Sequence, residues 1–271
     1  MVDAANEAKL TDLSNRIGNY DLIQELGRGP HGPVHLAVDT IRDRMVAIKR
    51  MQSLAGLGAE HRADLEDAFR RIAEMEAPNA GNAYAISPAA ESVPYVVRAH
   101  INGLTLTQLR THLRSMGDTF AVGLLYELAR SLAAYHRRTR AHGNLKPNNV
   151  FLLKSGEVRL VDAAFAGPLL VAHCKPTEGV LGDPRFAPAE QLTHGHCMPA
   201  GDLHAMRALA GFLDDANPNE ASAAGVAITT TATSAEAIVE SLAAWLTERR
   251  TSAKDVLFEA AQLVGYAFLM A

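Results

Sequence analysis

The stretch that most constrains the fold of this chain is HGNLKPNNV, at residues 142–150. A helix predicted over Thr119–Arg138 precedes it, and leucines at helical spacing give that helix one apolar stripe. A short apolar run, Val150–Leu153, follows it and predicts a buried strand. A polar loop therefore lies between a predicted amphipathic helix and a predicted buried strand.

This loop resembles the catalytic loop of the protein kinases, whose pattern is H-R-D-L-x-x-x-x-N. The resemblance places His142 at the histidine, Lys146 at the lysine and Asn149 at the metal-binding asparagine. The decisive difference is Asn144, because a kinase has there the aspartate that accepts the proton of the substrate hydroxyl. A neutral amide can accept a hydrogen bond, but its affinity for a proton is negligible. Asn144 is therefore expected to be a degraded base position in a kinase fold.

A glycine-rich segment near the N-terminus, GRGPHGPV at residues 27–34, has the pattern G-x-G-x-x-G-x-V. It is similar to the kinase loop that covers the phosphates of ATP, and strands predicted over Tyr20–Leu26 and Val34–Asp39 flank it. An ordinary glycine hairpin is the alternative interpretation. Pro30 lies near the tip and has no N–H to donate to a phosphate oxygen, which weakens the expected phosphate contact. The resemblance implies nucleotide-binding roles for Gly27, Gly29, Gly32 and Val34.

The next strand, VAIK at residues 46–49, resembles the kinase strand whose lysine reaches the α- and β-phosphates. The resemblance gives this role to Lys49 and places Ala47 among the nucleotide-binding residues. A helix predicted over Glu60–Glu76 follows, and it ends at residues 77–79, which are similar to the family's H-P-N motif. Counted back from that motif, the glutamate that pairs with the lysine falls on Ala68. The usual partner of the lysine is therefore expected to be missing.

The segment PYVVRAHING, residues 94–103, resembles the strand and hinge that hold adenine. Arg98 stands at the position that guards the back of the pocket, where the family usually has an apolar residue or threonine. His100 lies in the hinge and is a further nucleotide-binding candidate. The bulk of Arg98 is expected to narrow the adenine pocket.

Asp162 stands at the start of the D-F-G motif and is followed by two alanines. The metal-binding aspartate is therefore kept, and with Asn149 it implies a residual Mg²⁺ site that is occupied only if a nucleotide binds. Gly143 replaces the arginine that receives an activation-loop phosphate, and Asp183 replaces a threonine that bonds the catalytic aspartate and lysine. The altered positions are those that perform or regulate phosphate transfer.

The C-terminal part of the chain also resembles the kinase family. The resemblance implies that Asp202 anchors the catalytic loop from a helix and that Glu190 and Arg250 form a buried ion pair. Residues 214–234 are small and polar, which predicts a long loop. Apolar residues around Trp245 predict another helix.

Composition excludes several classes of function. The 271 residues carry a net charge of −4, which leaves no general electrostatic basis for binding nucleic acid or anionic lipid. Two cysteines are too few for a disulfide scaffold and fit a reducing compartment. The acidic, polar N-terminus is unlike a signal peptide, and the apolar run Leu263–Ala271 is too short to span a bilayer. These features predict a cytoplasmic protein without a membrane span.

The sequence also contains a candidate zinc site. The pair His173 and Cys174 and the segment HGHC at residues 194–197 could converge on zinc. Their spacing matches no known zinc finger, so unrelated surface histidines are the favoured interpretation.

The sequence predicts an α+β, bilobal protein kinase-like fold of the bacterial Ser/Thr type, with a β-rich N-lobe containing one long helix and a larger helical C-lobe. The expected boundaries are a leader at residues 1–18, an N-lobe at 19–100 and a C-lobe at 101–271. The favoured function is a pseudokinase that binds a protein partner and binds ATP with Mg²⁺ weakly or not at all. The alternatives are a slow ATP-dependent kinase, another nucleotide transferase on this fold, and a decayed paralogue without function.

Overall fold

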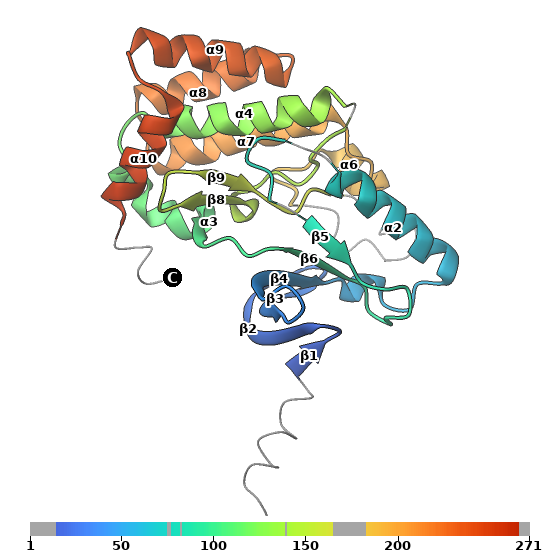
Figure 1. The fold of residues 1–271 in the computed structure, drawn as a ribbon. Helices are drawn as coiled ribbons and strands as arrows, with labels where there is room; N and C mark the ends of the chain where they lie inside the picture. The colour runs from blue at the N-terminus through green and yellow to red at the C-terminus, as the bar shows by residue number, and fades with distance from the viewer. Residues whose placement is uncertain (1–14, 75–76, 82, 139, 165–182, 266–271) are drawn as a thin grey trace, which may run out of the picture. The chain divides into compact units, whose positions relative to one another are not determined.

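The computed structural model describes residues 15–74, 77–81, 83–138, 140–164 and 183–265. The chain divides into two compact units (Figure 1). The smaller unit is Met1–Glu66 with Asn82–His100, and the larger unit is Asp67–Gly81 with Ile101–Ala271.

The smaller unit is built on a six-stranded antiparallel sheet with the order β1-β2-β3-β4-β6-β5. Its strands are β1 Arg16–Ile17, β2 Tyr20–Gly29, β3 Gly32–Asp39, β4 Arg44–Arg50, β5 Ala83–Ile86 and β6 Tyr95–Ala99. The strands predicted around the glycine-rich segment and the VAIK motif are confirmed as β2, β3 and β4. A 3₁₀ helix, η2 Gln52–Leu54, follows β4, and the predicted long helix is α2, Ala59–Ala73, whose residues from Asp67 onward belong to the larger unit.

One face of this sheet carries the apolar core of the smaller unit. Successive side chains of a strand point to opposite faces, and paired residues on neighbouring strands share a face. The core of this face consists of Ala37, Val46, Ile48, Tyr95 and Val97. The alternation of β4 therefore turns Ala47 and Lys49 toward the opposite face.

The larger unit is mainly helical. Its elements are β7 Gly103–Thr105, α3 Leu106–Leu109, η3 Arg110–Ser115, α4 Phe120–His136, η4 Pro147–Asn149, β8 Val150–Leu153, β9 Val158–Leu160, α6 Ala189–His194, α7 Pro199–Ala216, α8 Glu220–Thr231, α9 Ala235–Glu248 and α10 Ala253–Leu263. The leucine stripe of α4 is fully buried, and α7, α8, α9 and α10 pack against this helix (Figure 1). The helix and strand predicted on either side of the catalytic loop are thus confirmed as α4 and β8.

The loop predicted over residues 214–234 is wrong, because most of it is the helix α8. Asn219 caps this helix in a capping box with Ser222. Small residues face the neighbouring helices, and a Cβ at Gly225 would come 2.7 Å from Cδ1 of Leu125 on α4. The small, polar composition that suggested a loop therefore serves close helix packing.

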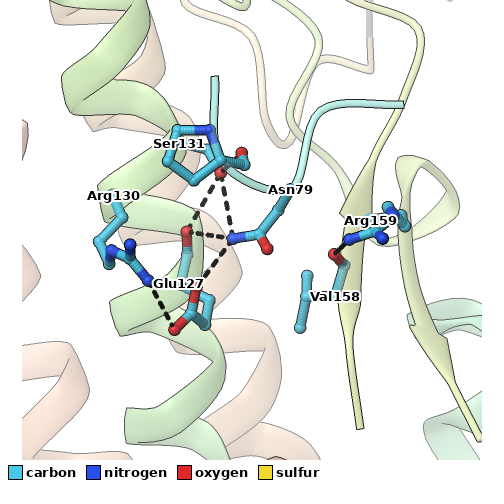
Figure 2. A network of polar contacts seen from close by, with 7 residues as sticks. Asn79, Glu127, Arg130, Ser131, Val158 and Arg159 are labelled. Carbon is cyan, nitrogen blue, oxygen red and sulfur yellow. Dashed lines mark hydrogen bonds and ion pairs between the residues drawn. The ribbon is translucent and has the colours of Figure 1, made fainter. Parts of the chain in front are cut away.

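The segment that follows α2 is bonded into the larger unit (Figure 2). Asn79 has a left-handed backbone, φ 60°, and its Nδ2 donates to the main-chain oxygen of Glu127 at 3.1 Å and to its Oε2 at 2.9 Å. Ser131 donates to the carbonyl of Pro78. The main chain of Asn79 also accepts a hydrogen bond from the N–H of Leu160 on β9, at 2.7 Å. Both α4 and β9 thus hold this turn.

Candidate functional site

Asp202, in the first turn of α7, anchors the catalytic loop through hydrogen bonds to its main chain. Its side chain is 1% exposed, and its oxygens accept from the N–H groups of His142 at 2.8 Å and of Gly143 at 2.7 Å. His136, at the end of α4, lies 3.0 Å from the same carboxylate. A buried carboxylate with hydrogen-bond donors on both oxygens is stable where an isolated one would not be. The anchoring role predicted for Asp202 is confirmed.

His142 is part of the packed base of the loop. Burial lowers the pKa of its imidazole, although the carboxylates of Asp202 and Asp162 act in the opposite direction. The ring is therefore neutral near pH 7, and its Nδ1 accepts a hydrogen bond from the N–H of Asn144 at 3.3 Å. The Tyr135 ring packs edge-on against it, with the centroids 5.6 Å apart.

The residue at the base position, Asn144, is hydrogen-bonded through both its side chain and its main chain. Its Nδ2 donates to the main-chain oxygen of Asp162 at 2.8 Å. Its own main-chain oxygen accepts from Nδ2 of Asn149 at 2.7 Å. Asp162 has a left-handed backbone, φ 59°. The structure therefore brings together the predicted base position and both predicted metal positions.

Asp183 replaces the family's threonine and forms a local clamp with Arg185. The guanidinium donates to both carboxylate oxygens, at 3.0 and 2.7 Å. This hydrogen bonding lowers the pKa of Asp183, burial opposes the shift, and the charge of Lys146 adds to it. Asp183, Asn144 and Lys146 line one small hollow between the catalytic loop and the start of α6 and α7. A carboxylate thus stands beside the catalytic-loop lysine.

Gly143, at the arginine position, has no room for a side chain. Its φ is 69°, and a Cβ built on it would lie 2.6 Å from Cβ of Cys197 and still closer to its Sγ. Nε2 of Gln191 donates to the carbonyl of Gly143 at 2.7 Å. Burial, with a smaller contribution from Asp202, raises the pKa of the Cys197 thiol to about 12. Cys197 is thus a packing residue, and the sequence offered no signal for this contact.

The predicted nucleotide-binding residues lie in the smaller unit. Lys49 is the cross-strand partner of Val34 on β3, and Ala47 is the partner of Arg98 on β6. Since paired residues of a sheet share a face, these four side chains are on the face opposite the apolar core. The Arg98 guanidinium donates to the carbonyl of Ala99 at 3.3 Å. His100 follows β6, and burial, with the charge of Arg98, lowers its pKa.

The glycine-rich segment is a tight hairpin whose tip consists of Pro30 and His31. Gly29 and Gly32 are the last paired residues, and Gly32 has φ 134°, which a residue with a side chain rarely adopts. Nδ1 of His31 lies 3.1 Å from Oγ of Ser53 on η2. The tip that covers phosphates in the kinases is therefore hydrogen-bonded to this 3₁₀ helix.

The sequence profile of the protein kinase domain matches residues 20–257. The chain belongs to the protein kinase family. It is 24% identical to the serine/threonine-protein kinase PrkC of Bacillus subtilis over 70% of this chain and 29% of PrkC. It is 29% identical to a probable serine/threonine-protein kinase PknB of Bifidobacterium longum over 64% of this chain and 27% of that protein. The chain spans less than half the length of these relatives.

A solved structure supports the same fold. The structure titled "PpkA-294 apo form" aligns with a TM-score of 0.61 and 19% sequence identity, over 84% of this chain and 96% of that one. With the β-rich smaller unit and the helical larger unit, this likeness establishes the bilobal α+β kinase-like fold. Protein kinases in general use ATP with Mg²⁺ and act on proteins.

One ion pair expected from the kinase family is not formed. Glu190 and Arg250 are both exposed and do not contact each other, and Arg250 has a left-handed φ of 54°. The preceding residue, Arg249, makes the contacts instead: it pairs with Glu220 and stacks on Trp245, with its guanidinium 3.8 Å from the ring centroid. The buried pair expected at this position is therefore wrong, because Glu190 and Arg250 are both exposed to solvent.

The rival zinc interpretation gains no support from the part of the chain that the structure describes. His173 and Cys174 lie outside the described residues. Among those described, no group of three or more His, Cys, Asp or Glu side chains could hold a metal ion. The described helices also include none with the length and apolar character needed to cross a membrane.

Proposed function

We propose that this protein is a pseudokinase: a kinase-fold module that acts in the cytoplasm by binding a protein partner and does not transfer phosphate. The observation that carries the proposal is the hydrogen bond from the Asn144 amide to the main-chain oxygen of Asp162, at 2.8 Å. A kinase needs a proton acceptor at this position. Here the position carries a neutral amide, and an N–H of that amide donates to the protein's own main chain.

The loss of the base removes a positioned proton acceptor, which typically contributes about 10²–10⁴-fold to the rate. The neighbouring change adds to this loss. Asp183 places a carboxylate, bonded mainly to Arg185, in the hollow that it shares with Lys146. In the family this position is an uncharged threonine. Both changes oppose transfer of a negatively charged phosphoryl group.

The metal positions and the nucleotide positions fit ATP with Mg²⁺ to different degrees. Asn149 and Asp162 offer the oxygen ligands that Mg²⁺ prefers, and the bond from Asn149 Nδ2 to the main chain leaves its Oδ1 for a cation. When bound with ATP, Mg²⁺ neutralises phosphate charge.

The phosphate and adenine positions fit ATP less well than the metal positions fit Mg²⁺. Pro30 lacks an N–H, His31 is hydrogen-bonded to Ser53, and Arg98 is bulky. We therefore propose weak or absent nucleotide binding.

A phosphotransfer assay tests this function. Purified protein, radiolabelled ATP and Mg²⁺ or Mn²⁺ are incubated with generic protein substrates, and wild type is compared with Asn144→Asp. We expect no transfer by wild type and no rescue by the single variant, because Asp183, Arg98 and the glycine-rich hairpin are unchanged. Turnover of the variant at ordinary kinase rates, roughly 1–100 s⁻¹, would refute the proposal.

The second candidate function is a slow kinase or another nucleotide transferase, which the retention of Lys49, Asn149 and Asp162 favours. Calorimetry with ATP, with and without Mg²⁺, separates the two. Wild type is expected to bind weakly with little dependence on Mg²⁺, and Arg98→Thr to bind more tightly. Tight, Mg²⁺-dependent binding by wild type would favour the enzyme.

A further inference from the structure

We propose that Asn144 is a positioning residue that ties the two metal positions of the larger unit together, in the place where a kinase has its base. The inference goes beyond the proposed loss of phosphate transfer and does not depend on it, because it concerns how the loop is held.

The hydrogen bonds around Asn144 form a closed ring. Nδ2 of Asn149 donates to the main-chain oxygen of Asn144 at 2.7 Å, and Nδ2 of Asn144 donates to that of Asp162 at 2.8 Å. The N–H of Val161 donates to the carbonyl of Asn149 at 3.0 Å, which closes the ring. The ring joins the catalytic loop to the residues that follow β9, across 18 positions of the chain.

The side chain of Asn144 must donate in this ring, because its partner is a carbonyl oxygen. An ionised aspartate has no hydrogen to donate and would place a negative oxygen against that carbonyl. Alanine would leave the carbonyl without this donor, with Asp162 still in its left-handed conformation, φ 59°. Among short side chains of this shape, only the amide, or a protonated acid, satisfies the geometry. The replacement of aspartate by asparagine thus adds a hydrogen-bond donor to a side chain that, as an ionised acid, could only accept.

The ring has a consequence for Asn149 and Asp162. The ring holds the side chain of Asn149, which is 6% exposed, and the main chain of Asp162 relative to each other. Asn144 acts through these residues and does not need to touch a ligand.

The test compares the thermal stability of wild type with those of Asn144→Asp, Asn144→Ala and Asn148→Asp between about pH 4 and pH 8. Asn148→Asp is the matched control, because it makes the same chemical change at an exposed residue four positions away. At pH 7.5 we expect Asn144→Asp to melt several degrees below wild type and Asn148→Asp to match wild type. As pH falls toward 4, a growing share of the new carboxyl, which lies near Lys146, Asp183 and Asp162, is protonated. Its O–H can then donate to the main-chain oxygen of Asp162, so the deficit of Asn144→Asp should shrink. The deficit of Asn144→Ala should not change with pH.

Hydrogen exchange at the N–H of Val161 gives a second readout. Loss of the Asn144 hydrogen bond should open the ring and speed this exchange at least about tenfold in Asn144→Ala. This measurement remains informative even if Asn144→Asp does not fold at pH 7.5. Unchanged exchange in Asn144→Ala would overturn the inference, as would an Asn144→Asp deficit that is absent or independent of pH. Such a failure is distinct from that of the proposed function, which is decided by phosphate transfer alone.

Discussion

The substitution Gly143→Ala adds a single methyl group at the tightest point of the catalytic loop. The backbone there is left-handed, φ 69°, which costs about 1–2 kcal/mol for a residue with a Cβ. The methyl would also lie 2.6 Å from Cβ of Cys197 and 3.2 Å from Cβ of Ala164. Overpacking of this kind typically costs about 1–3 kcal/mol. The expected loss in the free energy of unfolding is therefore about 2–5 kcal/mol.

Equilibrium unfolding in urea measures this loss, and the helix α7 offers a matched control. Gly211 lies inside α7, and a Cβ built there meets no atom within 4 Å. Gly211→Ala is expected to leave stability unchanged or raise it by about 0.4–1 kcal/mol, because alanine restricts the unfolded chain. The two variants make the same chemical change in opposite surroundings.

The double variant Gly143→Ala with Cys197→Ala measures how much of the loss comes from the contact with Sγ of Cys197. Removing Sγ relieves the closest contact, so the cost of Gly143→Ala should fall in the Cys197→Ala background. The remainder combines the backbone strain with the contacts to Cβ of residue 197 and Cβ of Ala164, which the double variant keeps. A loss below about 0.5 kcal/mol for Gly143→Ala, within the range of ordinary surface substitutions, would refute the reasoning. It would mean that the loop moves away from Cys197 at little cost and can accept the family's arginine.

Two further predictions concern charged residues. Glu190→Ala is expected to change the free energy of unfolding, measured in urea, by less than about 0.5 kcal/mol, because Glu190 is exposed. A loss of about 3–5 kcal/mol would instead show that Glu190 forms a buried ion pair with Arg250. Asp39→Asn should destabilise the protein by about 1–2 kcal/mol at pH 7. Burial would raise the pKa of Asp39, but the N–H groups of Arg42 and Ile41 and the charges of Arg42 and Arg44 lower it below its ordinary 3.8. The stability that this carboxylate contributes is therefore present above pH 3.8 and lost as pH falls through the depressed pKa. Thermal melts of wild type and Asp39→Asn should therefore converge as pH falls below 3.8, and a constant difference would contradict the assignment.

Much of the fold follows from local patterns in the sequence. The leucines of α4 recur at 3.6-residue spacing, and the motifs around Gly27, Lys49 and His142 appear in kinase order at kinase spacing. These patterns depend on neighbours along the chain, so they identify the family, the strands β2 to β4 and the helix α4 without coordinates. The loss of an ionisable group at position 144 is equally a property of the sequence, because a neutral amide is neutral in any fold.

The partners of these residues were decided only by the tertiary structure. The bond from Asn144 to Asp162 spans 18 positions, and Cys197 reaches Gly143 across 54. Whether Arg249 or Arg250 makes the ion pairs after α9 depended on one left-handed turn, and α8 required the packing of α4 against Gly225. Contacts of this kind depend on how distant elements pack, which spacing along the sequence does not report. The sequence alone therefore determined which chemistry Asn144 had lost, and the packed structure decided what the same side chain had gained.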